Sequence, residues 1–388
     1  MRLYNRTRLN TWPPIRYNAG RMYKSLQAGR AIAAVLVVLF HLGVAVSASK
    51  YFGIPAFGIP FSFGDSGVEF FFVLSGFIIF TAHRADISKP RKLAAYVYKR
   101  FIRVYPTYWI IFGVIFLMAL ALREDAPRDL GIILKSLALL PQDPGVVGGT
   151  GAPVIIVAWT LQYEIVFYLF FALLIVNQWM ALAAALAFAL NFGLCSLGAS
   201  CAFPRDFLAS WRMLVFGMGM IVAFAHASPK IKIARPGLLL VMGLAAYAII
   251  SADKVLQIGV LSAWKTPLYG VACSMIVLGL TRLEDAGRAL GRLPILQLLG
   301  DSSYALYLIH YPLISVMSKG ATLLGLTRSG PLAALAAYLV MLVACLLAAI
   351  AFHTLIEKPL LAALRKRAPR AAQTAPSKIN SAPGLGSS

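Results

Sequence analysis

Four ionisable side chains lie inside long apolar stretches of this sequence: His41, Glu69, Glu164 and His310. A charged group at the centre of a bilayer costs about 2.5–3.5 kcal/mol on insertion scales, so such residues are candidates for function. The unperturbed pKa of imidazole is near 6.5, and a neutral histidine can therefore act as a general base. We assign this role to His41. A histidine that only bonds across helices is the alternative.

Two carboxylates can complement such a base. Glu164 lies among aromatic residues near the middle of its apolar stretch, where a carboxylate needs a cation or a hydrogen-bond donor. It is expected to orient a histidine such as His41 or to bind a polar substrate, and a structural hydrogen bond between helices is the alternative. Glu69 follows Asp65 by one helical turn. This pair either helps to hold a polar substrate or stabilises a helix N-terminus.

Three polar residues near the C-terminal end share a helical spacing. Ser303, Tyr307 and His310 stand at i, i+4 and i+7, which places them on one face of a helix. Pro312 follows directly and predicts a kink. This pattern is typical of a polar channel, and also of a polar packing seam between helices.

Arg100 and Arg103 form an Arg-x-x-Arg pair before a long apolar stretch. At this spacing both side chains face the same way on a helix, and two guanidinium groups can grip a phosphorylated group. Arginine at a cytoplasmic helix end also serves to set topology, which is the alternative.

The four cysteines do not have metal-ligand spacing, so we expect neither a metal site nor a permanently bound cofactor. Cys195 and Cys201 lie near one helix end. They can form a disulfide if that end faces an oxidising space, and two free thiols are the alternative.

The elements that position these residues belong to an unusually apolar chain. Of its 388 residues, 60% are hydrophobic and 13% are charged, whereas soluble domains carry about 25% charged residues. A spanning helix needs about 20 mainly apolar residues, and helices satisfy their own backbone in lipid. The predicted fold is an all-α polytopic membrane bundle of about ten helices. Its spans are predicted at 28–47, 66–83, 104–122, 155–176, 179–197, 211–227, 237–251, 266–282, 303–320 and 332–356.

Two shorter features complete this picture. Gly131–Leu140 is apolar but too short to cross a membrane, so we expect an interfacial or re-entrant segment. Ser75 and Gly76 offer a small surface for close helix packing. Ser75 is not in a nucleophile elbow, and we do not expect it to be a nucleophile.

The net charge of +22 comes from 36 Lys and Arg against 14 Asp and Glu. Because the basic residues lie between apolar spans, they indicate topology and contact with anionic membrane lipids rather than with nucleic acid. The positive-inside rule predicts that both termini lie in the cytoplasm, and the location we expect is a bacterial inner membrane. We expect no cleavable signal peptide. The predicted regions are a basic segment at 1–25, a transmembrane domain at 26–362 and a basic, disordered tail at 363–388.

Ordered motifs along the chain resemble the membrane acyltransferase 3 family, which O-acylates bacterial surface polysaccharides and related glycans. Together they cover about residues 24–362. Glu69 stands where the family often has Asp. The motifs are Leu26–His41, Gly67–Phe77, Arg100–Pro106, Trp159–Tyr168 and Ser303–Pro312, followed by Glu357-Lys358-Pro359.

The resemblance implies a membrane enzyme that transfers an acyl group from cytoplasmic acyl-CoA to a carbohydrate hydroxyl, and the acyl group expected is acetyl. A transporter or flippase of a polar glycan is the main alternative, and a structural subunit of a polysaccharide assembly complex is another. The residues fall into three predicted roles: His41 and Glu164 in catalysis, Arg100 and Arg103 in CoA binding, and Glu69, Ser303, Tyr307 and His310 along the substrate channel.

Overall fold

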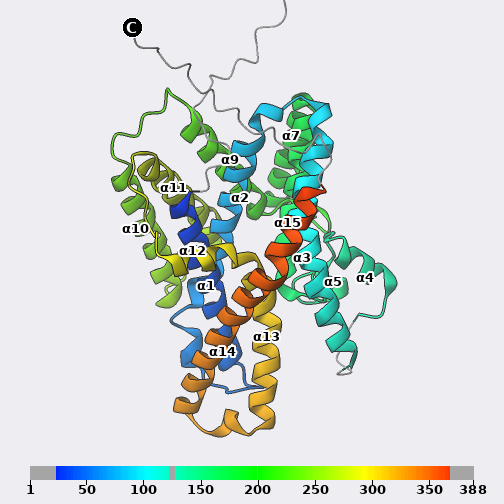
Figure 1. Ribbon diagram of the computed structural model, residues 1–388, viewed down its shortest axis with the longest axis vertical. Coiled ribbons are helices and arrows are strands. Elements are labelled where there is room, and N and C mark those ends of the chain that lie inside the picture. Colours follow the sequence, from blue (N-terminus) through cyan, green and yellow to red (C-terminus); the bar gives the residue numbers. More distant parts are fainter. Residues whose placement is uncertain (1–22, 122–126, 199, 368–388) are drawn as a thin grey trace, which may run out of the picture. The chain divides into compact units, whose positions relative to one another are not determined.

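The computed structural model describes residues 23–121, 127–198 and 200–367, which are drawn as coloured ribbons in Figure 1. The regular elements in these ranges are helices and none is a strand, which confirms the predicted all-α fold. The N-terminal segment 1–25 and the tail 363–388 fall largely outside the described residues, so both remain predictions.

Within the described residues, nine helical stretches are long and apolar enough to cross a membrane, and each overlaps a predicted span. The remaining predicted span, 303–320, is also a helix, α13 (Ser303–Leu323), but it is less apolar because it carries His310 and several hydroxyl groups. The chain is therefore a multi-pass membrane protein. The nine stretches are Lys24–Ser47, Pro55–Asp86, Pro90–Ala121, Ile156–Val176, Gln178–Ser196, Arg205–Ala227, Pro236–Val255, Ser262–Asp285 and Pro331–Lys366.

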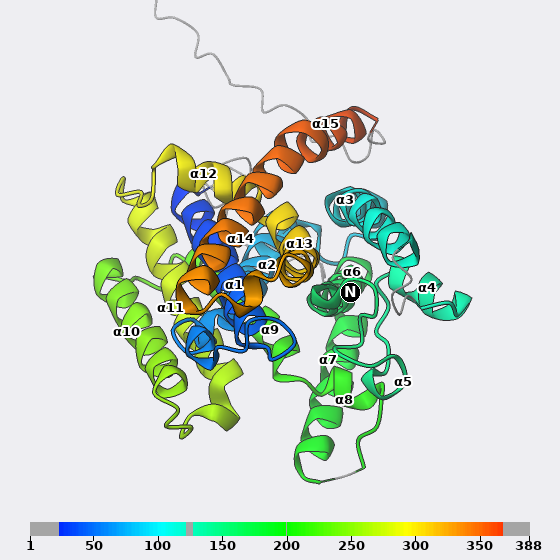
Figure 2. The same cartoon turned by 90° about the horizontal axis from the view of Figure 1, so that it is seen from below.

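The chain forms two compact units. The first contains residues up to Ala85 together with Ala209–Ile350. Its helix α1 (Lys24–Ser47) packs against several of its neighbours, as Figure 2 shows. These neighbours are α2 (Gly67–His83), α11 (Lys265–Asp285), α12 (Pro294–Asp301) and α13, and the same unit also holds α9 (Trp211–Ala227), α10 (Pro236–Val255) and α14 (Pro331–Phe352).

A carboxylate holds the first turn of α1 in place. The backbone N–H groups of Lys24 and Ser25 donate to the two carboxylate oxygens of Glu284 on α11, at 3.0 and 2.8 Å. The first N–H groups of a helix lack partners within the helix and favour a negative charge. Glu284 therefore fixes where α1 begins, and with it the height of every residue along α1.

The helices α2 and α9 touch through their backbones. A Cβ atom at Gly76 would lie 2.1 Å from the carbonyl oxygen of Phe216, and one at Gly219 would lie 2.1 Å from that of Val73. Neither position can take a larger residue without moving a helix. The predicted close packing at Gly76 is confirmed, and small residues are the usual means of bringing membrane helices together.

The second unit contains Asp86–Leu208 and the residues after Ile350. Its short helix α4 (Leu130–Leu137) matches the apolar segment that was too short to cross a membrane. The carbonyl groups at the end of α4 accept hydrogen bonds from Tyr105, Tyr108 and Trp109. The other elements of this unit are α3 (Leu93–Ala121), α5 (Pro144–Val147), α6 (Trp159–Val176), α7 (Gln178–Ser196), α8 (Arg205–Leu208), the π-helical turn His353–Glu357 and α15 (Lys358–Lys366).

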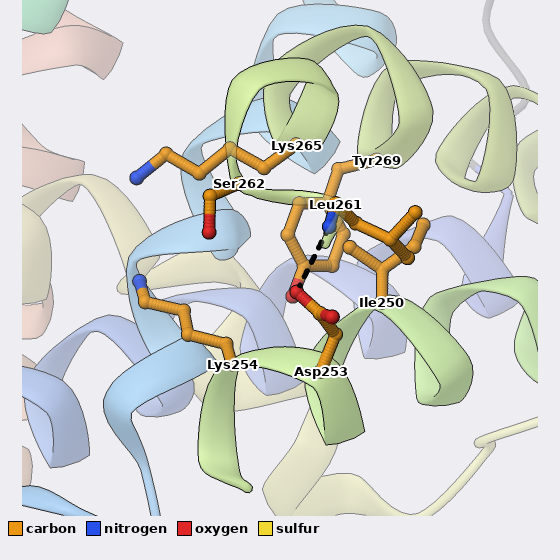
Figure 3. Close-up of a pocket in the computed structure, with 7 residues that line it drawn as sticks. All are labelled: Ile250, Asp253, Lys254, Leu261, Ser262, Lys265 and Tyr269. Carbon is orange, nitrogen blue, oxygen red and sulfur yellow. Dashed lines mark hydrogen bonds between the residues drawn. The ribbon is translucent and has the colours of Figure 1, made fainter. Parts of the chain in front are cut away.

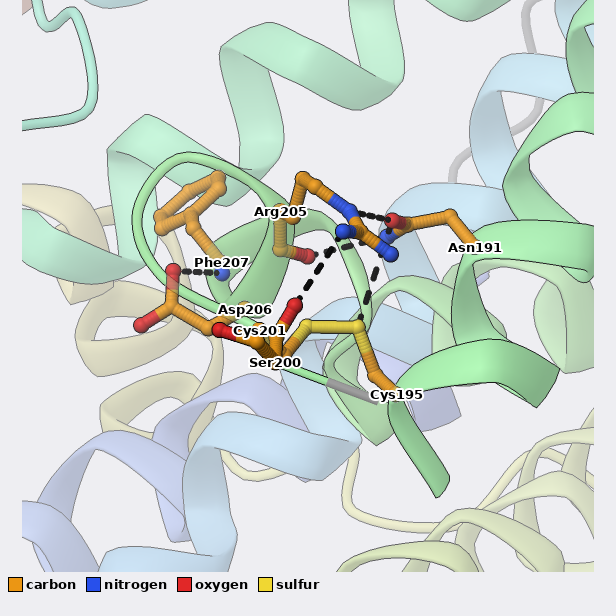
Figure 4. The surroundings of a disulfide bond; sticks show 7 residues. All are labelled: Asn191, Cys195, Ser200, Cys201, Arg205, Asp206 and Phe207. Atoms are coloured by element: carbon orange, nitrogen blue, oxygen red, sulfur yellow. Dashed lines mark hydrogen bonds between the residues drawn. A yellow bond between two sulfur atoms is a disulfide. The ribbon is translucent and has the colours of Figure 1, made fainter. Parts of the chain in front are cut away.

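Cys195, in the last turn of α7, forms a disulfide with Cys201, which follows the helix; their Cα atoms are 5.5 Å apart (Figure 4). The alternative of two free thiols is wrong for this structure. Beside the disulfide, Arg205 donates from Nε to the side-chain oxygen of Asn191 at 3.0 Å and from Nη1 to the carbonyl oxygen of Ser200 at 3.1 Å. These bonds tie the loop back to the end of α7.

Candidate active site

The first unit brings together two of the histidines that the sequence singled out. His41 lies on α1 and His310 on α13, and Nε2 of His310 is 3.2 Å from Nδ1 of His41. Their ring centroids are 4.9 Å apart. His310 is fully buried, whereas His41 is partly exposed. His41 is therefore the more accessible ring of the pair, and His310 is enclosed beside it.

Two backbone carbonyls assign the protons of this pair. Nδ1 of His41 lies 2.9 Å from the carbonyl oxygen of Val37, and Nδ1 of His310 lies 3.0 Å from that of Leu306. A carbonyl oxygen only accepts, so each Nδ1 carries the proton of its neutral ring. Nε2 of His310 then accepts from Nδ1–H of His41. Nε2 of His41 keeps its lone pair, as a general base requires.

Aromatic rings hold the imidazole of His41 in its orientation. Phe40 and Tyr311 pack edge-on against it, at centroid distances of 4.9 and 5.3 Å. The ring of Tyr307 lies 5.9 Å from that of His310. Ser303, Tyr307 and His310 are all buried on α13. They line a packed interior in this structure, and their role in a substrate channel remains a prediction.

A second contact between α1 and α13 involves Arg30, a residue that sequence reasoning left without a role. Its guanidinium donates from Nη2 to the hydroxyl of Ser303 at 2.9 Å and from Nη1 to the side-chain oxygen of Gln27 at 3.3 Å. Gln27 in turn donates to Asp301. An arginine close to the start of an apolar helix resembles a topology signal, so the sequence did not reveal its contact with Ser303, which precedes His310 by seven residues on α13.

Asp65 and Glu69, the two carboxylates of the first unit that the sequence singled out, lie in different environments. Asp65, in the 3₁₀ turn Ser62–Ser66, receives Nζ of Lys254 at 2.7 and 2.8 Å on its two oxygens. Glu69 is buried one turn further along, inside α2. Asp65 is therefore half of an ion pair whose lysine partner the sequence did not reveal, because Lys254 lies at a helix end where basic residues are common.

In the second unit, Arg100 lies between two tyrosine rings. Its guanidinium carbon is 6.0 Å from the ring centroid of Tyr96 and 5.8 Å from that of Tyr168, within the range of cation–π contacts. The hydroxyl of Tyr168 donates to the carboxylate of Glu164. Nε of Arg100 is buried without a hydrogen-bond partner among the described residues. The predicted pairing of Glu164 with His41 remains a prediction.

Arg103 is held by a carboxylate from the C-terminal part of the chain. Its Nη1 lies 3.6 Å from Oε1 of Glu357, which is fully buried, and the second oxygen of Glu357 lies 2.7 Å from Nδ1 of His353. The guanidinium of Arg103 stays about one-third exposed, at 34%. It is therefore oriented by a buried anion and still accessible to a ligand.

These features define a multi-pass membrane protein that has an imidazole pair suited to proton transfer and an arginine pair suited to binding an anion. The chain belongs to the membrane acyltransferase 3 family, because the family's sequence profile, described as an acyltransferase domain, matches residues 23–352. The family identifies the chain as an acyltransferase.

Two characterised relatives support this assignment. The chain is 31% identical to the exopolysaccharide production protein ExoZ of Rhizobium meliloti over 320 residues, which cover 80% of this chain and 93% of the relative. It is 27% identical to the acyltransferase MdmB of Streptomyces mycarofaciens over 354 residues, which cover 81% of this chain and 84% of the relative. No solved structure matches the chain.

Proposed function

We propose that this protein transfers an acetyl group from acetyl-CoA to a hydroxyl of an exported or cell-surface carbohydrate. The observation that carries the chemistry is the His41–His310 pair, in which Nε2 of His41 keeps a lone pair on a partly exposed ring. The carbohydrate acceptor is inferred from the relative named for exopolysaccharide production.

In the proposed reaction, Nε2 of His41 removes the proton of the acceptor hydroxyl as the oxygen attacks the thioester carbon. The carbon–sulfur bond then breaks, and the leaving thiolate takes the proton back from His41 to give free CoA. While His41 is charged, its Nδ1–H donates to Nε2 of His310 and to the carbonyl of Val37, which stabilises the imidazolium. The hydroxyl of Tyr307 or a backbone amide is the candidate donor to the developing oxyanion.

The donor site in this proposal is the arginine pair of the second unit. Arg100 and Arg103 bind the phosphates of CoA at the cytoplasmic side of the membrane. The part-exposed side chain of Arg103, which a buried carboxylate orients, supports this assignment, and Arg100 lies one turn before it against two tyrosine rings. Glu164 fixes Tyr168, whose ring lies beside Arg100, and so acts as a positioning residue for the donor site.

The test is mass spectrometry of the surface glycans of cells with and without this protein, coupled to CoA release by the purified protein. The proposal expects an ester-sized mass on the glycan and one free CoA for each ester formed. A transporter or flippase would move the glycan without releasing CoA, and that result would reject the proposal.

A further inference from the structure

The first unit contains a small polar pocket of about 90 Å³ between the end of α10 and the start of α11. Figure 3 shows its side chains, with the polar ends of Lys254, Ser262 and Lys265 gathered on one side. Asp253, Ile250, Leu261 and Tyr269 complete the lining. Ionisable groups at helix ends are common, but several of them around one pocket make a candidate ligand site.

The two carboxylates around this pocket already have donors on both of their oxygens. Asp253 accepts from the backbone N–H groups of Val260 and Leu261, at 3.1 and 3.2 Å. Asp65 receives the ammonium of Lys254 on both oxygens. Every oxygen of the two carboxylates therefore already has one donor.

The donors of the pocket are used less fully. Nζ of Lys265 lies 4.0 Å from Asp65, beyond hydrogen-bond distance, and its side chain is 47% exposed. The hydroxyl of Ser262 lies between the two ammonium groups in Figure 3. A pocket whose spare groups are donors, one of them an ammonium that lies near Asp65 but makes no hydrogen bond to it, matches a ligand with one negative charge and acceptor oxygens.

The pocket lies next to the imidazole pair. Nζ of Lys254 is 5.6 Å from the ring centroid of Phe40, and the same ring packs against His41 with a centroid distance of 4.9 Å. One aromatic side chain thus separates the charged pocket from the proposed general base.

We propose that this pocket binds the carboxylate of an acidic sugar in the acceptor carbohydrate, with Lys265 and Ser262 as its donors. This inference rests on the proposed function and specifies its acceptor as a uronic-acid-type glycan. A carboxylate has one charge and planar paired oxygens, which suit one ammonium and one hydroxyl. The bound sugar presents a hydroxyl of the same or the adjoining residue to Nε2 of His41.

The experiment measures binding without acyl-CoA, so that its outcome does not depend on catalysis. The full-length protein in nanodiscs of zwitterionic lipid is titrated with a glucuronic-acid oligosaccharide and with a neutral glucose oligosaccharide of equal length. The acidic oligosaccharide is expected to bind more tightly. Lys265→Gln should weaken its binding about 10-fold or more, as expected for one charge-assisted hydrogen bond, whereas Lys265→Arg should retain most of it.

Three results would overturn the inference. The first is equal affinity for the two oligosaccharides. The second is unchanged affinity in a Lys265→Gln protein that melts at the wild-type temperature. The third is complete displacement of the acidic oligosaccharide by phosphatidylglycerol, which would assign the pocket to a lipid headgroup. If acyl transfer to a neutral glycan persists in any of these cases, the proposed function stands and only its acidic acceptor is rejected.

Discussion

Nε2 of His310 lies 3.2 Å from Nδ1 of His41, although the two histidines are 269 positions apart in the chain. Each ring is also held by the carbonyl group four residues before it on its own helix, at Val37 and Leu306. The helical backbone therefore fixes the tautomer of both rings, and the contact between α1 and α13 fixes the position of one imidazole ring relative to the other. A carboxylate plays the supporting part in many catalytic histidine sites, and here an imidazole occupies that position.

The first prediction separates the roles of the two histidines. His41→Ala should lower acyl transfer by about 100-fold to 10,000-fold, the usual contribution of a general base. His310→Ala should cost less, about 10- to 100-fold, because Val37 still holds the ring of His41 and only one hydrogen bond to the charged form is lost. The measurement is release of CoA thiol by each purified variant, with acyl-CoA binding measured separately.

Tyr311→Phe is the matched control for these variants, because Tyr311 touches His41 through its ring and the substitution keeps that ring. It should retain wild-type turnover. The double variant lacking both histidines should be no slower than His41→Ala, since a support without a base contributes nothing. Additive losses in the double variant would show that His310 acts in a separate step.

The second prediction concerns the donor site. Arg103→Ala should weaken binding of acyl-CoA about 10-fold or more, because a charge-assisted contact to phosphate is lost. Glu357→Gln should weaken it less, since Glu357 orients Arg103 at 3.6 Å and does not itself bind the donor. Titration calorimetry with CoA gives both affinities directly. Lys92→Ala, an exposed basic residue that precedes α3, is the control. Wild-type affinity in Arg103→Ala would leave the arginine pair with a topological role only.

The third prediction tests the backbone contact between α2 and α9. Gly219→Ala should lower the free energy of unfolding by about 1–3 kcal/mol, because the added Cβ would lie 2.1 Å from the carbonyl oxygen of Val73 and force the helices apart. Gly217→Ala is the control on the same helix, since a Cβ there would meet nothing within 4 Å. Melting in detergent, followed by size-exclusion chromatography, compares the two. Equal melting temperatures would contradict the observed helix packing.

The fold was predictable because length and apolarity alone define a membrane helix. Each of the nine spanning stretches overlaps a predicted span, and the helix of 303–320 was also predicted although its polar residues make it less apolar than the others. The close packing at Gly76 was predictable from residue size, but its partner Gly219 was not, because helix pairing depends on contacts between distant segments. The division into two units left no composition signal along the chain.

The site was predictable as residue types and not as pairs. His41 and His310 stood out because a lipid-embedded helix seldom carries a polar group without cause. The contact between the two histidines could not be predicted, since it requires α1 and α13 to lie side by side. Arg30, Lys254 and Lys265 received no role from the sequence, because their partners lie far away in the chain and only a structure shows these contacts.

The fourth prediction concerns the Cys195–Cys201 disulfide. The protein has four cysteines, of which Cys273 and Cys345 are buried free thiols. Protein denatured without reductant should therefore take two maleimide labels, and protein denatured after reduction should take four. Cys195→Ser should leave three thiols under both conditions, which controls for incomplete labelling. Four labels without reductant would mean that the bond does not form in the cell.

The same experiment reports the side of the membrane on which the end of α7 lies. Disulfides persist in the bacterial periplasm and are rare in the cytosol, so an oxidised Cys195–Cys201 pair places that helix end outside. The disulfide lies at the C-terminal end of α7. Once the side of that end is known, the order of the spans gives the direction in which each other span crosses the membrane. By that order the start of α3, with Arg100 and Arg103, falls on the cytoplasmic side, where acyl-CoA is available to the proposed donor site. A reduced pair would remove the support for this orientation and would require the donor site to be sought elsewhere.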